Sequence, residues 1–120
     1  MIQASFFYDQ AGVLRAFDFS GHAGFADRGF DIVCAAVSAI GQTVIGTMEE
    51  LIGEALVYEL DPVRGKIACK LEDYDRYTET EKIALGALMF SAYIGIEQLV
   101  PNYGEYIAVE KKTYLEEAHD

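Results

Sequence analysis

The sequence has few cysteines, few histidines and few basic residues, and each shortage excludes a class of protein. Of 120 residues only two are cysteine and two are histidine, and all four are scattered along the chain. Two thiols do not make the disulfide framework of a small secreted domain, and scattered ligands do not make a four-ligand metal site. We therefore expect a reduced protein without metal or cofactor. The N-terminal residues lack the pattern of a signal peptide, which favours the cytoplasm.

The shortage of basic residues limits the kinds of partner. The chain has 9 Lys and Arg against 20 Asp and Glu, for a formal net charge of −11. Binding to phosphate groups requires clustered Lys and Arg, so we expect no direct contact with nucleic acid. Opposite charge would instead steer a basic protein toward this one, although acidity of this kind also serves solubility alone.

Two segments without any formal charge are typical of core helices. They cover 32–48 and 83–96. In the first, Gln42 and Thr43 interrupt the run of about 20 apolar residues that a membrane span needs, so we expect no membrane segment there. Apolar residues recur at helical spacing in both segments: Val33, Val37, Ile40, Val44, Met48 and Leu51, then Leu85, Leu88, Ala92, Ile96 and Leu99.

Residues typical of helix ends flank both segments. They are Asp31 as N-cap and Gly53 as C-cap of the first helix, and the capping box Thr78–Glu81 and the terminating Pro101 of the second. Side chains that accept from free N–H groups start a helix, and glycine and proline end one. Gly41 and Gly46 each cost the first helix about 1 kcal/mol relative to alanine, so we expect a neighbouring element to approach closely at both.

Five stretches with period-2 alternation predict strands. They are 2–8, 13–19, 55–60, 66–71 and 105–111. Turn residues at 9–12 and 61–65 join the first four into two hairpins. The order β-β-α-β-β-α-β predicts one α+β domain over 1–120, with a largely antiparallel sheet and two buried helices; the acidic tail 114–120 is expected to fray. Helices without charge need cover on every side, so we expect a homodimer.

A histidine and a cysteine flank the glycine-containing loop 20–29. Cys34 falls in the first turn of a helix that Asp31 starts, where free N–H groups and the helix dipole favour a thiolate. A thiolate attacks carbonyl carbon, and the N–H groups near Cys34 and Ala35 are expected to hold the resulting oxyanion. His22 lies twelve residues earlier and has the pKa of a general base and acid. The pattern predicts a cysteine hydrolase.

Each of these residues also has an ordinary structural explanation. A cysteine in an apolar helix, such as Cys34, is usually a small buried hydrophobe, and Cys69, on a predicted strand, is expected to lie in the core or on neutral surface. A histidine in such a loop is usually solvated, Asp31 is first a helix cap, and Ser38 is usually a packing residue bonded to its own helix. A non-catalytic ribosome-assembly or peptide-binding module with a structural thiol is therefore the alternative. A redox sensor is less favoured, because no second cysteine lies near Cys34 in sequence.

Two short segments, Ser20–Ala23 and 31–38, together resemble the signature of the ribosomal-processing cysteine protease family Prp, and the similarity extends over essentially the whole chain. The resemblance implies that His22 and Cys34 are the catalytic pair. It leaves Asp31 and Ser38 as supporting residues of unassigned role.

The same resemblance implies a substrate and an assembly. Family members are cytoplasmic homodimers that remove a short N-terminal extension from large-subunit ribosomal protein number twenty-seven. The loop is thought to cover the site and to order around the substrate. Its glycines, Gly21, Gly24 and Gly29, would then act as hinges for a closure step of the kind that many enzymes use. An acidic enzyme that meets a basic ribosomal protein agrees with the charge of the chain.

Overall fold

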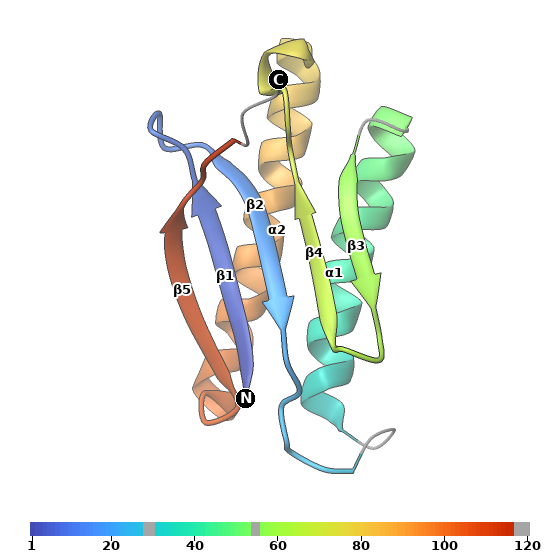
Figure 1. The fold of residues 1–120 in the computed structure, drawn as a ribbon, viewed down its shortest axis with the longest axis vertical. Helices are drawn as coiled ribbons and strands as arrows, with labels where there is room; N and C mark the ends of the chain where they lie inside the picture. The colour runs from blue at the N-terminus through green and yellow to red at the C-terminus, as the bar shows by residue number, and fades with distance from the viewer. Residues whose placement is uncertain (28–30, 54–55, 117–120) are drawn as a thin grey trace.

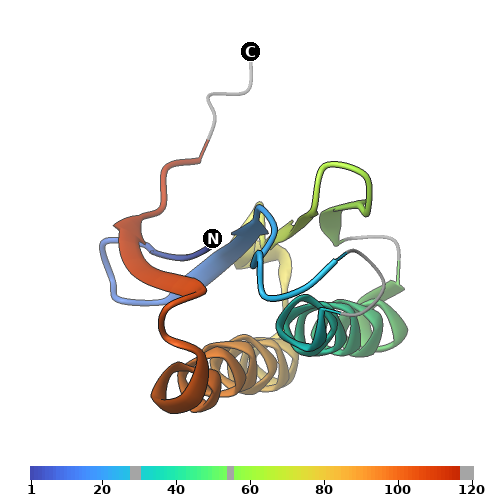
Figure 2. The ribbon, with the colours of Figure 1, turned by 90° about the horizontal axis from the view of Figure 1, so that it is seen from below.

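A computed structural model describes residues 1–27, 31–53 and 56–116 of the chain. It contains a five-stranded sheet with two helices packed against one of its faces (Figures 1 and 2). The predicted α+β class and the element order are confirmed. In chain order the elements are β1 (Ile2–Tyr8), β2 (Leu14–Ser20), α1 (Ile32–Ile52), β3 (Val57–Asp61), β4 (Lys66–Lys70), the 3-10 turn η2 (Tyr74–Arg76), α2 (Glu79–Tyr103) and β5 (Ile107–Thr113).

The strand order in the sheet is β3-β4-β2-β1-β5. Every pair is antiparallel except β1 and β5, because α2 carries the chain back to the end of the sheet at which β1 begins (Figure 1). The last ladder pair between β2 and β4 joins Ser20 to Lys66. The chain therefore leaves β2 beside the β3–β4 turn, at the end of the fold where α1 starts.

The core lies between the sheet and the two helices. Apolar residues on one face of β1 and β2 are buried beneath the helices, as the period-2 pattern predicts: Ile2, Ala4 and Phe6, and Phe17 and Phe19. The aromatic rings pack against one another, with 5.6 Å between the centroids of Phe6 and Phe19. Burial of this apolar face stabilises the sheet at roughly 25 cal/mol per Å².

One of the two predicted close approaches along α1 is confirmed. A Cβ added at Gly41 would lie 2.8 Å from Cγ2 of Ile67, so the helix meets β4 at this point. The prediction for Gly46 is wrong, because a Cβ there would meet no atom within 4 Å. The close contact between the helices is instead at Gly95 of α2, where an added Cβ would lie 3.1 Å from the side chain of Ile40.

The helix caps follow the sequence, but one helix end does not. Asp31 and Gly53 cap α1, and Thr78 begins α2 through a complete capping box with Glu81. Pro101 lies inside α2 rather than ending it, so that prediction is wrong. A proline inside a helix removes one backbone hydrogen bond and crowds the carbonyl four residues earlier, yet α2 continues past Pro101 to Tyr103.

The part of the tail that the structure describes is held in place, contrary to the prediction that it frays. Tyr114 N donates to Tyr8 O at 2.7 Å, and Glu116 Oε1 accepts from Arg15 Nη2 at 2.7 Å. The guanidinium of the buried Arg15 also lies over the ring of Tyr114, 4.5 Å from its centroid. Residues 117–120 of the predicted tail, and residue 55 of the predicted third strand, lie outside the described residues.

Within one chain each helix packs one side on the rest of the fold and exposes apolar residues on the other, so the predicted cover of the remaining side by a partner subunit stays a prediction. The outer side of α2 exposes Ile83 (74%), Phe90 (56%) and Ile94 (39%). By length and composition alone both helices could cross a membrane, but a core helix passes the same test. Here each packs one apolar face on the sheet (Figure 2), as expected of core helices.

Candidate active site

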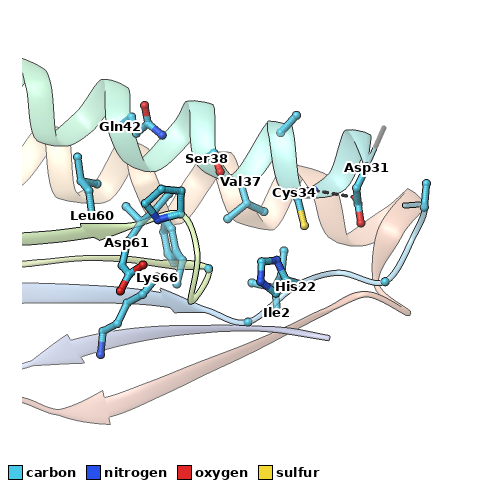
Figure 3. A pocket seen from close by; sticks show the side chains of 18 residues that line it. Ile2, His22, Asp31, Cys34, Val37, Ser38, Gln42, Leu60, Asp61 and Lys66 are labelled. Carbon is cyan, nitrogen blue, oxygen red and sulfur yellow. Dashed lines mark hydrogen bonds between the residues drawn. The ribbon is translucent and has the colours of Figure 1, made fainter. Parts of the chain in front are cut away.

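A cavity of about 680 Å³ opens where β2 leaves the sheet and α1 begins. One wall is the first three turns of α1, and the other is the β3–β4 hairpin (Figure 3). His22, Asp31, Cys34, Ala35 and Ser38 all line it. The fold thus brings these five residues, which the sequence identifies as candidates, into one cavity. The role of the β3–β4 hairpin as its other wall was not predicted.

Asp31 connects the start of α1 to the preceding loop. Its Oδ1 accepts from the backbone N–H groups of Val33 and Cys34, both at 3.0 Å, and its Oδ2 accepts from Phe25 N at 3.1 Å. Burial alone would raise the pKa of this carboxyl, but the donated hydrogen bonds outweigh it and hold the pKa below its usual value. Asp31 is therefore a charged cap that also fixes the loop.

Cys34 lies half-buried in the first turn of α1, and its Sγ accepts from Ala23 N at 3.2 Å. Burial raises the pKa of the thiol; the Ala23 N–H acts in the opposite direction, and the negative charge of Asp31 raises the pKa further. The prediction of a resting thiolate is wrong for this conformation. The carboxylate occupies the N–H groups at the start of the helix, so they are not available to stabilise a sulfur anion.

The predicted oxyanion donors are also engaged. Cys34 N donates to Asp31 Oδ1, and Ala35 N donates to the backbone oxygen of Asp31 at 3.1 Å. The donor directed at the sulfur is instead the N–H of Ala23, whose side chain is buried in the core. Sequence reasoning missed this residue. The feature of the sequence that could have identified it is its type: a small apolar residue directly after His22 can be buried while its neighbours stay exposed.

His22 lies in the same cavity as Cys34, but its side chain comes from the loop after β2, whereas Cys34 comes from α1 (Figure 3). Its imidazole packs against the β3–β4 turn: a Cβ added at Gly65 would lie 2.8 Å from Cε1 and 3.0 Å from Nε2. Within the part of the chain that the structure describes, no hydrogen bond joins His22 to Cys34. The pair shares one pocket without being in contact for proton transfer.

The remaining predicted residues fall as follows. Ser38, one turn after Cys34, lines the cavity, as do Gly21 and Gly24, which have φ values of +99° and +73° (Figure 3). Gly29 lies outside the described residues. Cys69 is buried in β4, and burial raises the pKa of its thiol, so it is the core residue that the sequence predicts. No grouping of three or more metal-binding side chains occurs among the described residues.

The hairpin wall is the part of the cavity that sequence reasoning missed. It contributes residues from the predicted turn and from the ends of the two strands predicted on either side of it: Leu60, Asp61, Pro62, Gly65, Lys66 and Ile67. A turn that follows a helix by several residues carries no local signal of its distance from that helix. Only the antiparallel pairing of β4 with β2 brings it to the loop.

A family model described as cysteine protease Prp matches residues 1–108. The chain belongs to the cysteine protease Prp family. The predicted resemblance is confirmed, and with it the assignment to cysteine proteases rather than to non-catalytic binding modules. A search of curated proteins found no match.

Solved structures agree with the fold. The protein SMU.848 from Streptococcus mutans is 30% identical, with a TM-score of 0.76 over 95% of this chain and 96% of its own. An essential ribosomal processing protease Prp from S. aureus, in complex with a covalently linked product peptide, is 21% identical, with a TM-score of 0.79 over 93% of this chain and 100% of its own. A complex of the S. aureus protease with a substrate peptide has a TM-score of 0.75 at 20% identity, with the same coverage.

Proposed function

We propose that this Prp-family protease removes the N-terminal extension of large-subunit ribosomal protein number twenty-seven, with Cys34 as nucleophile and His22 as general base and acid. The supporting observation is the cavity that contains both side chains and receives the Ala23 N–H at the sulfur. The net charge of −11 favours a basic substrate. Such a substrate is met before the ribosome matures, in the cytoplasm.

The resting thiol sets the order of events. Because burial and then Asp31 raise its pKa, Cys34 is protonated before substrate binds, and His22 has to take the proton. In the proposed cycle the imidazole turns from the β3–β4 turn toward Sγ when a peptide fills the cavity. Sγ then attacks the scissile carbonyl carbon, and His22 passes its proton to the leaving amine.

The second half of the cycle restores the enzyme. The attack leaves the N-terminal fragment joined to Cys34 as a thioester, and the neutral imidazole can now deprotonate a water molecule. Hydroxide adds to the thioester carbonyl, the C–S bond breaks, and the proton returns to sulfur. The Ala23 N–H, 3.2 Å from Sγ at rest, is the donor placed to stabilise charge on the sulfur or on the adjacent oxyanion.

Incubation with the ribosomal protein that carries its native N-terminus tests this function, with product masses as the readout. We expect a single cut in the extension, and loss of cutting in Cys34→Ala and in His22→Ala. The control is Cys69→Ala, which removes the other thiol from the core and should keep activity in the folded fraction. Full activity of the Cys34→Ala protein would disprove the mechanism, and an uncut extension would disprove the substrate.

We also propose that the protease is a homodimer whose partner covers the outer side of α2. Support comes from three exposed apolar side chains, Ile83, Phe90 and Ile94, on one side of this helix. A second copy would remove that surface from water, as symmetric dimers commonly do. Light scattering of the purified protein should give twice the chain mass, and Phe90→Asp should give the single-chain mass. A wild-type protein that is monomeric at micromolar concentration would refute the proposal.

A further inference from the structure

We propose that Gly65, in the turn between β3 and β4, is a positioning residue for His22. The inference depends on the proposed role of His22 as the base. It concerns the part of the β3–β4 turn against which the imidazole packs, rather than the imidazole itself. Gly65 is 43 positions from His22 in sequence, and the register of β2 with β4 brings the two together.

The first contact fixes the backbone next to the histidine. Gly21 N donates to Gly65 O at 2.8 Å, directly beyond the last ladder pair of β2 and β4. On its other side Gly21 meets the N-terminus, because an added Cβ would lie 2.6 Å from Met1 O. The residue before His22 is therefore held between two backbone segments, and this determines where the His22 side chain begins.

The second contact is with the imidazole ring. A Cβ on Gly65 would lie 2.8 Å from Cε1 and 3.0 Å from Nε2 of His22, and 2.8 Å from Gly21 O. Real Cβ atoms essentially never come within 3.0 Å of another heavy atom. Any side chain at this position would have to displace the ring, the Gly21 backbone, or both.

The turn itself does not require glycine at this position. Asp61 Oδ1 already accepts from the N–H groups of Val63 and Arg64, at 3.1 and 3.0 Å, which stabilises the turn. Gly65 has φ +64°, a left-handed conformation that asparagine also tolerates. What excludes a side chain is the contact with Gly21 O, in the backbone directly before His22, and with the His22 ring itself. We infer that glycine is needed here for the position of the base.

A matched pair of variants separates these two roles. Gly65→Asn adds a Cβ against His22. Gly12→Asn adds the same side chain at φ +83° in the β1–β2 turn, where no atom lies within 4 Å of the added Cβ. Both test a left-handed turn position, and only the first displaces the imidazole. If Gly65→Asn does not fold, as judged by circular dichroism, Gly65→Ala places the same Cβ with a smaller side chain.

Three measurements follow on the folded variants: the cleavage rate, the rate at which iodoacetamide alkylates Cys34 across pH, and the NMR signal of the His22 imidazole. We expect Gly65→Asn to lower the cleavage rate by about 10- to 100-fold, because the added Cβ also displaces the Gly21 backbone from which the His22 side chain begins, and moving a catalytic group by about 1 Å has an effect of this size. Gly12→Asn should leave it unchanged. Cys69 is buried, so alkylation reports on Cys34.

Coupling to His22 distinguishes positioning from general damage. In a protein that already carries His22→Ala, Gly65→Asn should change Cys34 alkylation no further, because the group it displaces is absent. Equal rates for Gly65→Asn and Gly12→Asn, or effects that multiply in the double variant, would overturn the proposal. Full activity of His22→Ala would refute the proposed function instead; the imidazole signal then still shows whether Gly65 fixes the ring, and an unmoved signal in Gly65→Asn would overturn the inference.

Discussion

Asp31 starts α1, the helix that carries Cys34, and holds the loop that precedes it, so its substitution tests two effects that can be separated. Asp31→Ala removes the acceptor of Val33 N, Cys34 N and Phe25 N. Loss of an N-cap costs about 0.5–2 kcal/mol, and the loop contact is lost as well. Asp31→Asn keeps one carbonyl oxygen that caps nearly as well, while its NH2 group cannot accept the exposed hydrogen bond from Phe25 N. We expect urea unfolding to show a loss of about 1–2 kcal/mol for alanine, with asparagine close to wild type.

The effect on the thiol has a defined sign. Burial is the largest cause that raises the pKa of Cys34, and the charge of Asp31 raises it further. Asp31→Asn removes that charge, so the pKa of Cys34 falls, more thiolate is present near pH 7, and iodoacetamide reacts faster. The assay is the alkylation rate from pH 6 to pH 10 (about the range over which thiols titrate).

The control is the cap of the other long helix. Thr78 accepts from Glu81 N at 3.1 Å in the capping box of α2, and Thr78→Ala should cost about 1 kcal/mol of stability without any change in alkylation. Slower alkylation in Asp31→Asn would show that the carboxylate activates the thiol, and would refute this account of the site. A change of alkylation in Thr78→Ala would show that stability alone alters the measurement.

Two further predictions concern the scaffold. Gly41→Ala forces a methyl group against Ile67, so the overpacking cost of about 1–3 kcal/mol outweighs the gain in helix propensity of about 1 kcal/mol. Gly46→Ala places its methyl group in open space and should stabilise the protein by about 0.5–1 kcal/mol. Urea unfolding midpoints that move in the same direction for both variants would contradict the packing described for α1. Arg15→Met leaves Leu71 O and the carboxylates of Asp9 and Glu116 without their guanidinium partner, and should destabilise by about 2–4 kcal/mol. It should also speed hydrogen exchange at Tyr114 N; unchanged exchange there would show that the tail is held without Arg15.

The features that could be predicted from sequence are those with local causes. Asp31, Gly53 and Thr78 begin or end helices through hydrogen bonds within a few residues of themselves, so the pattern alone identifies them. Alternation along β1 predicts its buried face for the same reason. The catalytic motif could be recognised because His22 and Cys34 lie on either side of one loop, and the cavity contains both.

The features that could not be predicted depend on pairing between distant segments. The parallel contact of β5 with β1, the tail on Arg15 and the hairpin wall of the cavity each join segments more than 30 positions apart. The residue types in one segment do not indicate which distant segment pairs with it in the fold. Gly65 illustrates this limit, because in sequence it is an ordinary turn glycine, and only the register of β4 with β2 makes it a neighbour of His22.

The error about the thiolate has a different cause, because the sequence already places Asp31 and Cys34 at the start of this helix. A helix start stabilises an anion only if its N–H groups are free, and the side chain that begins α1 is itself an anion that uses them. The more fully Asp31 accepts hydrogen bonds from these N–H groups, the less they can stabilise a thiolate at Cys34. Of the donors near the sulfur, the Ala23 N–H in the loop still points at it. In the proposed mechanism, activation of Cys34 therefore comes from His22 and from the Ala23 N–H.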